Sequence, residues 1–223
     1  MDRNLGAMDI YYHGADGHYG DLYYQFGRKD PFSGPRKIYI RQDNEDNYSY
    51  VSWSTSTYTI QNTAADANCN NVPYSIQHPL TFIVGDYWTY NDIYNPTTYE
   101  SKIRWQDPYV MDDTGKSMFD PCPLGWKTPK DGTWAGFSMS NFLLNNPLSV
   151  GRNDPTSSAF YPASGWLDFG SGAFNLVGSH GDYWSCSPYN ASKGYLLDFY
   201  SGGVYPSLTY TRAYGFPVRC VQE

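Results

Sequence analysis

The sequence of 223 residues has little charge and no long apolar run, and each absence excludes a class of protein. Charged residues make up 17% of the chain, below the usual share of about 25%, and the net charge is −7. Without a basic stripe to neutralise phosphates, we expect no nucleic-acid binding. No apolar run approaches the roughly 18 residues of a transmembrane helix, so we expect no direct membrane span.

Motifs for catalysis or for a bound group are also missing. Neither G-x-S-x-G nor the strand–turn–helix context of a phosphate-binding loop occurs. The cysteines form no C-x-x-C pair of the kind that binds zinc. His13 and His18, with Asp16 between them, fit no single helix face, and a plain turn explains them better than a metal site. We therefore expect no enzyme activity, no cofactor and no metal.

The chain is rich instead in aromatic and turn-forming residues, with 23 Tyr, 21 Gly and 7 Trp. This composition predicts a single α+β domain with many short strands, few helices and long loops. Strands are expected over residues 22–27, 36–40 and 48–60, and again from about residue 159 onward. Residues 61–75 are expected to form a loop. Residues 133–144 are expected to form the one helix, because their apolar residues partly follow helical spacing.

Four cysteines allow three disulfide pairings, and two compartments remain open. They could be reduced thiols of a cytosolic protein or disulfides of an exported one. The tyrosine-rich, lysine-poor composition is typical of extracellular binding surfaces and favours export. The N-terminus lacks a signal-peptide pattern, so we expect the chain to be the C-terminal part of a longer protein.

Six segments, spread from residue 2 to residue 221, together resemble one family. They are DRNLGA (2–7), LYYQFGRKDPF (22–32), FDPCPLGWKTP (119–129), FYPASGW (160–166), VGSHGDYWSCSPY (177–189) and GFPVRCV (215–221). The resemblance is to the Fibrobacter succinogenes major paralogous domain, which has a C-type-lectin-like fold similar in architecture to formylglycine-generating enzyme.

The resemblance implies a C-type-lectin-like fold in an adhesive protein on the surface of a gut bacterium or a phage virion. It also implies a disulfide between Cys122, in the DPCP motif, and Cys220, in the terminal VRCV motif. Cys69 and Cys186 are not assigned by the pattern. The reactive cysteines of the formylglycine-generating enzymes do not map onto this sequence, so that activity is not carried over.

The C-terminal tail resembles the variable region of proteins that diversity-generating retroelements rewrite at adenines. In such regions, fixed scaffold residues alternate with changeable surface residues. The changeable positions here contain no Lys, Glu, Gln, Trp or Met, which adenine mutation of an Asn codon does not produce. The expected ligand-binding set is Leu196, Asp198, Tyr200, Gly203, Tyr205, Leu208, Thr209, Tyr210, Thr211 and Tyr214, with His180 and Asp182 as weaker candidates.

Strand alternation gives this interleaving a physical basis, because successive side chains point to opposite faces. Three residues are expected to face the core: Tyr195, Leu197 and Phe199. Three are expected to face the solvent: Leu196, Asp198 and Tyr200. Solvent exposure is likewise expected for Tyr205, Tyr210 and Tyr214. Tyrosine is suited to a binding surface because it offers a large, rigid, amphipathic contact at a small entropy cost.

The sequence therefore predicts an adhesin or receptor-recognition domain whose ligand is a protein or glycan on another cell. Three alternatives stay open: an invariant pilus-tip or structural surface module, a calcium-independent carbohydrate-binding domain, and a member of the formylglycine-generating class. The oligomeric state and the identity of the ligand are not predicted.

Overall fold

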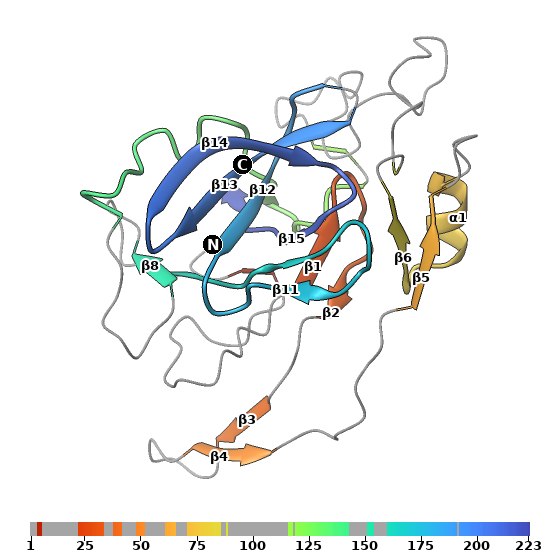
Figure 1. The fold of residues 1–223 in the computed structure, drawn as a ribbon, viewed down its shortest axis with the longest axis horizontal. Coiled ribbons are helices and arrows are strands. Elements are labelled where there is room, and N and C mark those ends of the chain that lie inside the picture. Colours follow the sequence, from red (N-terminus) through yellow and green to blue (C-terminus); the bar gives the residue numbers. More distant parts are fainter. Residues whose placement is uncertain are drawn as a thin grey trace.

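Strands dominate the structure, which is a computed structural model (Figure 1). It describes residues 4–5, 22–33, 38–41, 48–51, 61–65, 71–85, 88, 116–117, 119–142, 151–153, 160–190 and 192–223. The strands form several small sheets, and the described residues contain a single short helix. The prediction of many short strands with little helix is confirmed.

The longest strands form a three-stranded antiparallel meander near the C-terminus. Its strands are β12 (Gly181–Pro188), β13 (Lys193–Tyr200) and β14 (Gly203–Thr211). On β14 two residues, Pro206 and Ser207, stand opposite the single residue Leu197 on β13 and form a bulge. Proline is tolerated there because it lies at a bulge on an edge strand, where its missing N–H breaks no regular ladder.

A five-stranded sheet joins the N-terminal part of the described chain to the C-terminal part. Its strands, in spatial order, are β11 (Phe174–Asn175), β10 (Trp166–Leu167), β15 (Gly215–Pro217), β1 (Leu22–Gln25) and β2 (Phe32–Ser33). β1 pairs antiparallel with β15, with Tyr24 opposite Phe216. This pairing of distant segments confirms the strand predicted over residues 22–27.

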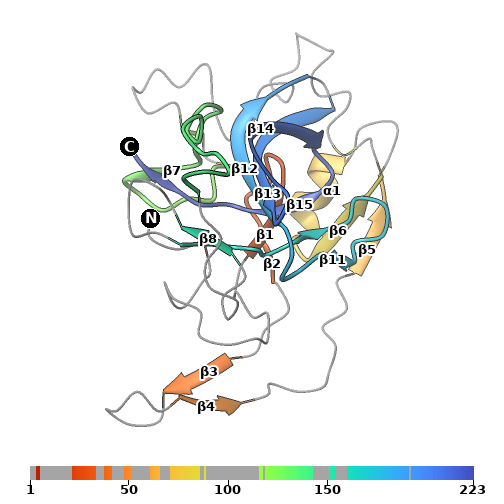
Figure 2. The same ribbon diagram turned by 60° about the vertical axis from the view of Figure 1, so that its left-hand side comes forward.

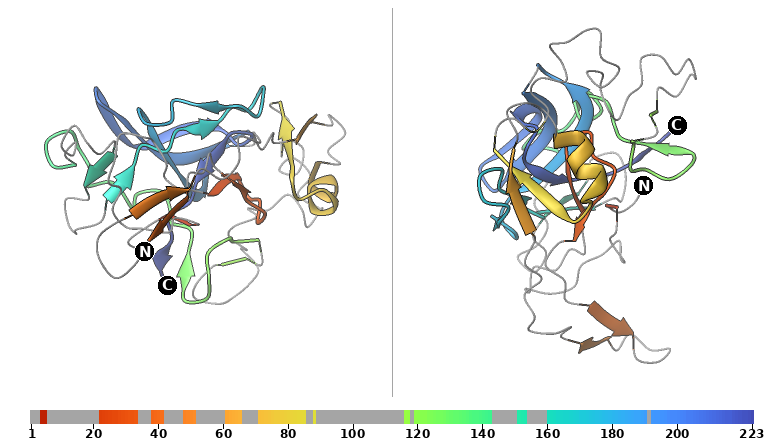
Figure 3. Two further views of the ribbon diagram at one scale, coloured as in Figure 1. Left: turned by 90° about the horizontal axis from the view of Figure 1, so that it is seen from below. Right: turned by 90° about the vertical axis from the view of Figure 1, so that its right-hand side faces the viewer.

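Four two-stranded pairs and the helix complete the described elements (Figures 2 and 3). They are β3 (Ile38–Arg41) with β4 (Tyr48–Val51), β5 (Gln61–Ala64) with β6 (Thr81–Val84), β7 (Trp126–Lys127) with β16 (Val221–Gln222), β8 (Gly151–Asn153) with β9 (Phe160–Pro162), and helix α1 (Asn71–Gln77). The β3–β4 hairpin lies apart from the other elements in Figures 1 and 2. β3 confirms the strand expected at residues 36–40, and β4 confirms the start of the one expected at 48–60, whose remainder lies outside the described residues.

The three-stranded sheet has a hydrophobic cluster on each of its faces. On one face, Leu197 and Phe199 of β13 pack with Tyr183 of β12 and with the aromatic residues Trp134 and Phe142. On the other face, Leu196 and Trp184 belong to a cluster that also contains Phe216, Cys122 and Cys220. The central strand is therefore covered on both sides along much of its length.

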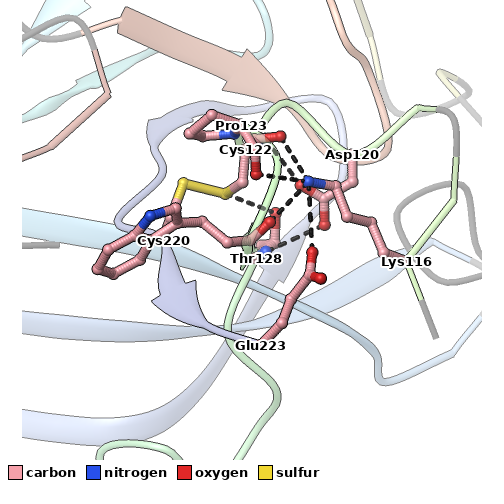
Figure 4. The surroundings of a disulfide bond; sticks show 8 residues. Lys116, Asp120, Cys122, Pro123, Thr128, Cys220 and Glu223 are labelled. Carbon is pink, nitrogen blue, oxygen red and sulfur yellow. Dashed lines mark hydrogen bonds and ion pairs between the residues drawn. A yellow bond between two sulfur atoms is a disulfide. The ribbon is translucent and has the colours of Figure 1, made fainter. Parts of the chain in front are cut away.

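A disulfide between Cys122 and Cys220 confirms the pairing that the family resemblance implied. Close to it, the Lys116 ammonium donates hydrogen bonds to the carbonyl oxygens of Cys122, Pro123 and Trp126, at 2.6, 2.8 and 2.6 Å (Figure 4). The same ammonium lies 3.6 Å from a carboxylate oxygen of Glu223. The disulfide and this lysine together tie the middle of the chain to its C-terminal end.

The helix predicted over residues 133–144 is wrong: residues 131–136 form turns, and residues 143–144 lie outside the described residues. The backbone N–H groups of Thr133, Ala135 and Phe137 each donate to the carbonyl three residues before, so the chain makes successive tight turns. Gly132 has a φ of 87°, which no right-handed helix contains. The Asn141 side chain further competes with helix formation, since it accepts from the N–H of Ser138 and donates to the carbonyl of Gly136.

The loop expected over residues 61–75 is also wrong. Residues 61–64 form β5, which pairs in parallel with β6, and α1 begins at Asn71 between the two strands. The segment is polar, so its local pattern gave no strand signal. Pairing with β6, rather than local composition, determines its structure.

Candidate ligand-binding surface

The alternation of side chains along β13 is as predicted, but one of its two faces is much less exposed than expected. Leu196 is only 1% exposed and Asp198 only 4%, so the prediction that both face solvent is wrong. Leu196 stands opposite Trp184 on β12, and both pack in the cluster that contains the disulfide. A second hydrophobic cluster thus covers the part of this face that the alternation alone assigned to solvent.

The opposite face of β13 agrees with its prediction at two of three positions. Leu197 and Phe199 are fully buried, as expected. Tyr195 lies on the same face but is only half-buried, so it is less enclosed by the core than expected. Its ring packs edge-on against Tyr189, which is 55% exposed in the β12–β13 loop, with ring centroids 5.4 Å apart. Tyr195 lies near the loop end of the strand, where less of the core reaches it.

Four tyrosines of the tail remain accessible to solvent. Tyr205 is 42% exposed, and Tyr200, Tyr210 and Tyr214 are half-buried. The rings of His180, Tyr200 and Tyr205 stack in succession, with centroid distances of 4.9 and 6.2 Å and interplanar angles of 17° and 22°. The hydroxyls of Tyr200 and Tyr205 lie 3.5 Å apart, and this contact raises the pKa of Tyr200 above its ordinary value.

Further rings extend this stack into one continuous aromatic network. Trp166 meets the His180 ring edge-on at 5.6 Å and the Tyr214 ring edge-on at 6.4 Å. Tyr214 also contacts Phe169 at 4.8 Å and Tyr210 at 5.4 Å. We call this network the tyrosine surface; its members are Trp166, Phe169, His180, Tyr200, Tyr205, Tyr210 and Tyr214.

Sequence reasoning missed two members of the tyrosine surface, Trp166 and Phe169. Both are half-buried and lie in and after β10, outside the tail. β10 reaches the tail because Leu167 pairs with Gly215 of β15. The FYPASGW segment that contains Trp166 contributed to the family resemblance, but no local pattern placed it beside the tail.

Two carboxylates, Asp182 and Asp198, face each other across β12 and β13 on the same sheet face as Tyr200 and Tyr205. We call them the acid pair. Asp182 is only 1% exposed, so its expected place on an exposed surface is wrong. Both were candidates from the sequence, but no sequence signal predicted their pairing. The register shifts between Trp184 and Pro188, so counting back from the Pro188–Gly194 pair would place Asp182 opposite Tyr200.

Burial raises the pKa of Asp182 well above its ordinary value, and the neighbouring Asp198 carboxylate raises it further. Burial also raises the pKa of Asp198, while a hydrogen bond from Asp182 and the nearby His180 imidazole act in the opposite direction. Two carboxyl groups that face each other in a buried site cannot both ionise easily, because their like charges repel. The acid pair therefore favours a state in which one carboxyl is protonated, and the stronger upward shift of its pKa makes Asp182 the carboxyl that holds the proton more readily.

The remaining sequence candidates lie along β14. Leu208, Thr209 and Thr211 are half-buried, and Gly203 is buried. A Cβ atom at Gly203 would lie 2.5 Å from the Tyr205 ring, so this glycine leaves the space in which that ring lies beside Tyr200. The structure thus brings most of the predicted set together on one face of the three-stranded sheet, where some of the residues are buried and others reach the solvent.

Metal and membrane sites have no support within the described part of the chain. It contains no group of three or more His, Cys, Asp or Glu side chains arranged to hold a metal ion. None of its helices is long and apolar enough to cross a membrane. The histidines at 13 and 18, with Asp16, lie outside the described residues, as does Cys69.

Comparison with known proteins gives one match. The sequence model of a family described as a domain of unknown function (DUF8237) matches residues 150–221, which contain the three-stranded sheet and the whole tyrosine surface. No curated protein and no solved structure matches the chain.

Proposed function

We propose that this protein is a ligand-binding domain of an adhesin or receptor-recognition protein, displayed outside the cell, and that the tyrosine surface contacts its ligand. The observation that carries the proposal is the exposure of Tyr205 beside three half-buried tyrosines in one aromatic network. An aromatic cluster of this kind is unusual on an inert surface. A C-type-lectin-like fold, a cell-surface or virion location, and a protein or glycan ligand belong to the same proposal.

The packing of these rings is suited to binding. Tyr200 is held between His180 and Tyr205, so little side-chain freedom remains to be lost when a ligand is bound. Four of the rings, those of Trp166, Tyr200, Tyr205 and Tyr210, are carried on β-strands, which favours a precise surface. The disulfide next to the second hydrophobic cluster supports an oxidising location.

Diversification of this surface is the finer part of the proposal. Burial narrows the changeable set, because Leu196, Asp198 and Gly203 are buried. The positions left with access to solvent are Tyr200, Tyr205, Leu208, Thr209, Tyr210, Thr211 and Tyr214. A reverse-transcriptase gene near the coding sequence, with a template repeat that matches residues 180–221 except at adenines, would establish diversification. A template whose adenines fall instead on the codons of Leu197 and Phe199 would refute it.

Binding itself is tested with arrays of glycans and of extracellular host proteins. We expect a ligand whose signal falls at least tenfold in Tyr200→Ala and in Tyr205→Ala, since both remove ring faces from the stack. Tyr189→Ala is the control, because it removes a tyrosine that is more exposed than either but lies outside the tyrosine surface. If all three variants retain the signal, the ligand binds elsewhere and the proposal fails.

A calcium-independent carbohydrate-binding domain is the second candidate function. Half-buried rings such as Trp166 and Tyr214 offer apolar faces on which a sugar ring can stack. The same arrays separate the two candidate functions, because a carbohydrate-binding domain must give signals with neutral oligosaccharides. Loss of those signals in Tyr210→Ala, with no protein hit, would favour the carbohydrate-binding function.

A further inference from the structure

The acid pair lies beside the exposed part of the tyrosine surface, on the same face of the three-stranded sheet. In the register of the sheet, Asp182 stands opposite Asp198, and Asp198 stands opposite Tyr205, so the three form one row across β12, β13 and β14. The neighbouring row toward the sheet's end holds the His180–Tyr200 stack. The row on the other side holds Trp184 and Leu196 of the core. The acid pair therefore separates the hydrophobic core from the aromatic rim.

The acid pair lacks the partners that a buried carboxylate normally has. Neither side-chain oxygen of Asp182 has a hydrogen-bond partner in the described residues. Asp120, near the disulfide, shows the usual arrangement: it accepts from the N–H groups of Cys122 and Thr128, at 2.8 and 3.0 Å. A buried polar group that is left unsatisfied requires an explanation, and a ligand is one of the recognised ones.

No lysine or arginine of the described residues forms an ion pair with Asp182 or Asp198. The nearby His180 imidazole acts against the rise in the pKa of Asp198. Burial raises the pKa of Tyr210, and the nearby Asp198 and Asp182 raise it further. The negative charge of the pair therefore acts on a ring of the tyrosine surface. The site therefore presents negative potential behind accessible ring faces.

We propose that the ring of Tyr205, with Tyr200 and His180 beside it, is the anchor for an arginine side chain of a protein partner, with the acid pair supplying the opposite charge. This inference rests on the proposed function and specifies the ligand as a protein with a basic contact surface. A guanidinium group stacks flat on tyrosine faces and is readily desolvated. A guanidinium group on the exposed ring of Tyr205 would interact with the buried carboxylates through protein of low dielectric constant, which strengthens their attraction.

Two further observations favour arginine as the occupant. This chain already places its own guanidinium groups over rings, with Arg212 4.8 Å from the centroid of Phe26 and Arg219 4.1 Å from that of Tyr161. The net charge of −7 attracts a basic partner and repels an acidic one. A neutral glycan would contact the rings but leave the charge of the acid pair uncompensated.

The test uses two probes of nearly identical shape on the whole chain: Nα-acetyl-arginine amide, which is cationic, and Nα-acetyl-citrulline amide, which is neutral. Binding is followed by NMR through the ring resonances of His180 and Tyr205. We expect saturable changes in these resonances at millimolar concentrations of the arginine probe and at least tenfold weaker binding of the citrulline probe. Equal binding of the two probes, or no change with either, overturns the inference without any variant being needed.

Variants of the two aspartates then test whether the acid pair supplies the negative charge. In Asp182→Asn/Asp198→Asn, the affinity for the arginine probe should fall to that for the citrulline probe, whereas Tyr189→Ala should leave it unchanged. Unchanged arginine affinity in a folded double Asn variant contradicts the role of the acid pair. If array binding depends on Tyr205 but is carried by neutral glycans, the proposed function stands and the arginine anchor fails. If array binding ignores the tyrosine variants, the proposed function itself fails.

Discussion

Leu196 belongs to the tail residues that the sequence assigned to a variable surface. Replacing it by alanine tests whether it lies in the core instead. Leu196 is 1% exposed and packs with Trp184 and Leu208 in the cluster that contains the disulfide. Removing its three outer carbons forfeits about 2.4 kcal/mol of transfer free energy, at about 0.8 kcal/mol per carbon. The cavity left behind raises the cost, so we expect the free energy of unfolding to fall by about 3–4 kcal/mol.

Urea unfolding followed by tryptophan fluorescence measures this loss, and thermal unfolding should show a Tm lower by about 6–16 °C for a chain of this length. Thr209→Ala is the control, since Thr209 is half-buried on β14 and belongs to the same interleaved set. Its expected cost is below about 1 kcal/mol. If Leu196→Ala costs as little as Thr209→Ala, Leu196 is not a core residue and the second cluster does not cover this face.

Three further perturbations follow from the structure. Cys122→Ser/Cys220→Ser opens a loop with a sequence separation of 98, so the free energy of unfolding in urea should fall by up to about 4.7 kcal/mol; a loss below about 1 kcal/mol would contradict this. Asp182 has a raised pKa when folded, so its stabilising effect is present below pH 3.8 and is lost as pH rises through the folded pKa. Asp182→Asn should therefore be more stable than the natural chain at pH 7 in urea unfolding, and the gain should vanish near pH 3; a destabilised variant at pH 7 would refute this. Gly165 has a φ of 64°, and a Cβ there would lie 2.2 Å from a backbone carbonyl oxygen, so Gly165→Ala should cost more than about 2 kcal/mol in a urea titration, while Gly125→Ala, with open space around it, should cost less; equal costs would show that the crowding does not matter.

A stabilising Asp182→Asn would bear on function as well as on stability. The natural chain would then retain a carboxylate that weakens its own fold. Such trade-offs are typical of functional sites, where a group is kept for what it binds. This outcome would be consistent with the arginine anchor, in which the pair is retained for the negative charge that it presents to a ligand.

Local patterns predicted what depends on neighbours in the sequence. Alternation correctly separated Leu196 and Asp198 from Leu197 and Phe199, since it is a property of any strand. It could not predict that the face of Leu196 would be covered, because the covering residues, such as Phe216, come from another sheet. The burial of each face is thus set by tertiary packing that no strand pattern contains.

The errors elsewhere have the same origin. Residues 133–144 have apolar residues at partly helical spacing, yet the chain turns repeatedly so that Trp134, Phe137 and Phe142 all reach one cluster. The disulfide was predicted correctly only through family resemblance, because four cysteines leave the pairing open. Trp166 was missed at the site because β10 approaches the tail only through its pairing with β15.

Selection from a display library tests most directly whether the tyrosine surface is a binding surface on a tolerant scaffold. The library randomises Tyr200, Tyr205, Tyr210 and Tyr214 within the otherwise natural chain and is selected against a single purified protein with a basic surface. We predict folded binders with micromolar or tighter Kd, whose Tm lies within a few degrees of that of the natural chain. A library in which most members fail to fold, or folded members that never bind, would contradict the account.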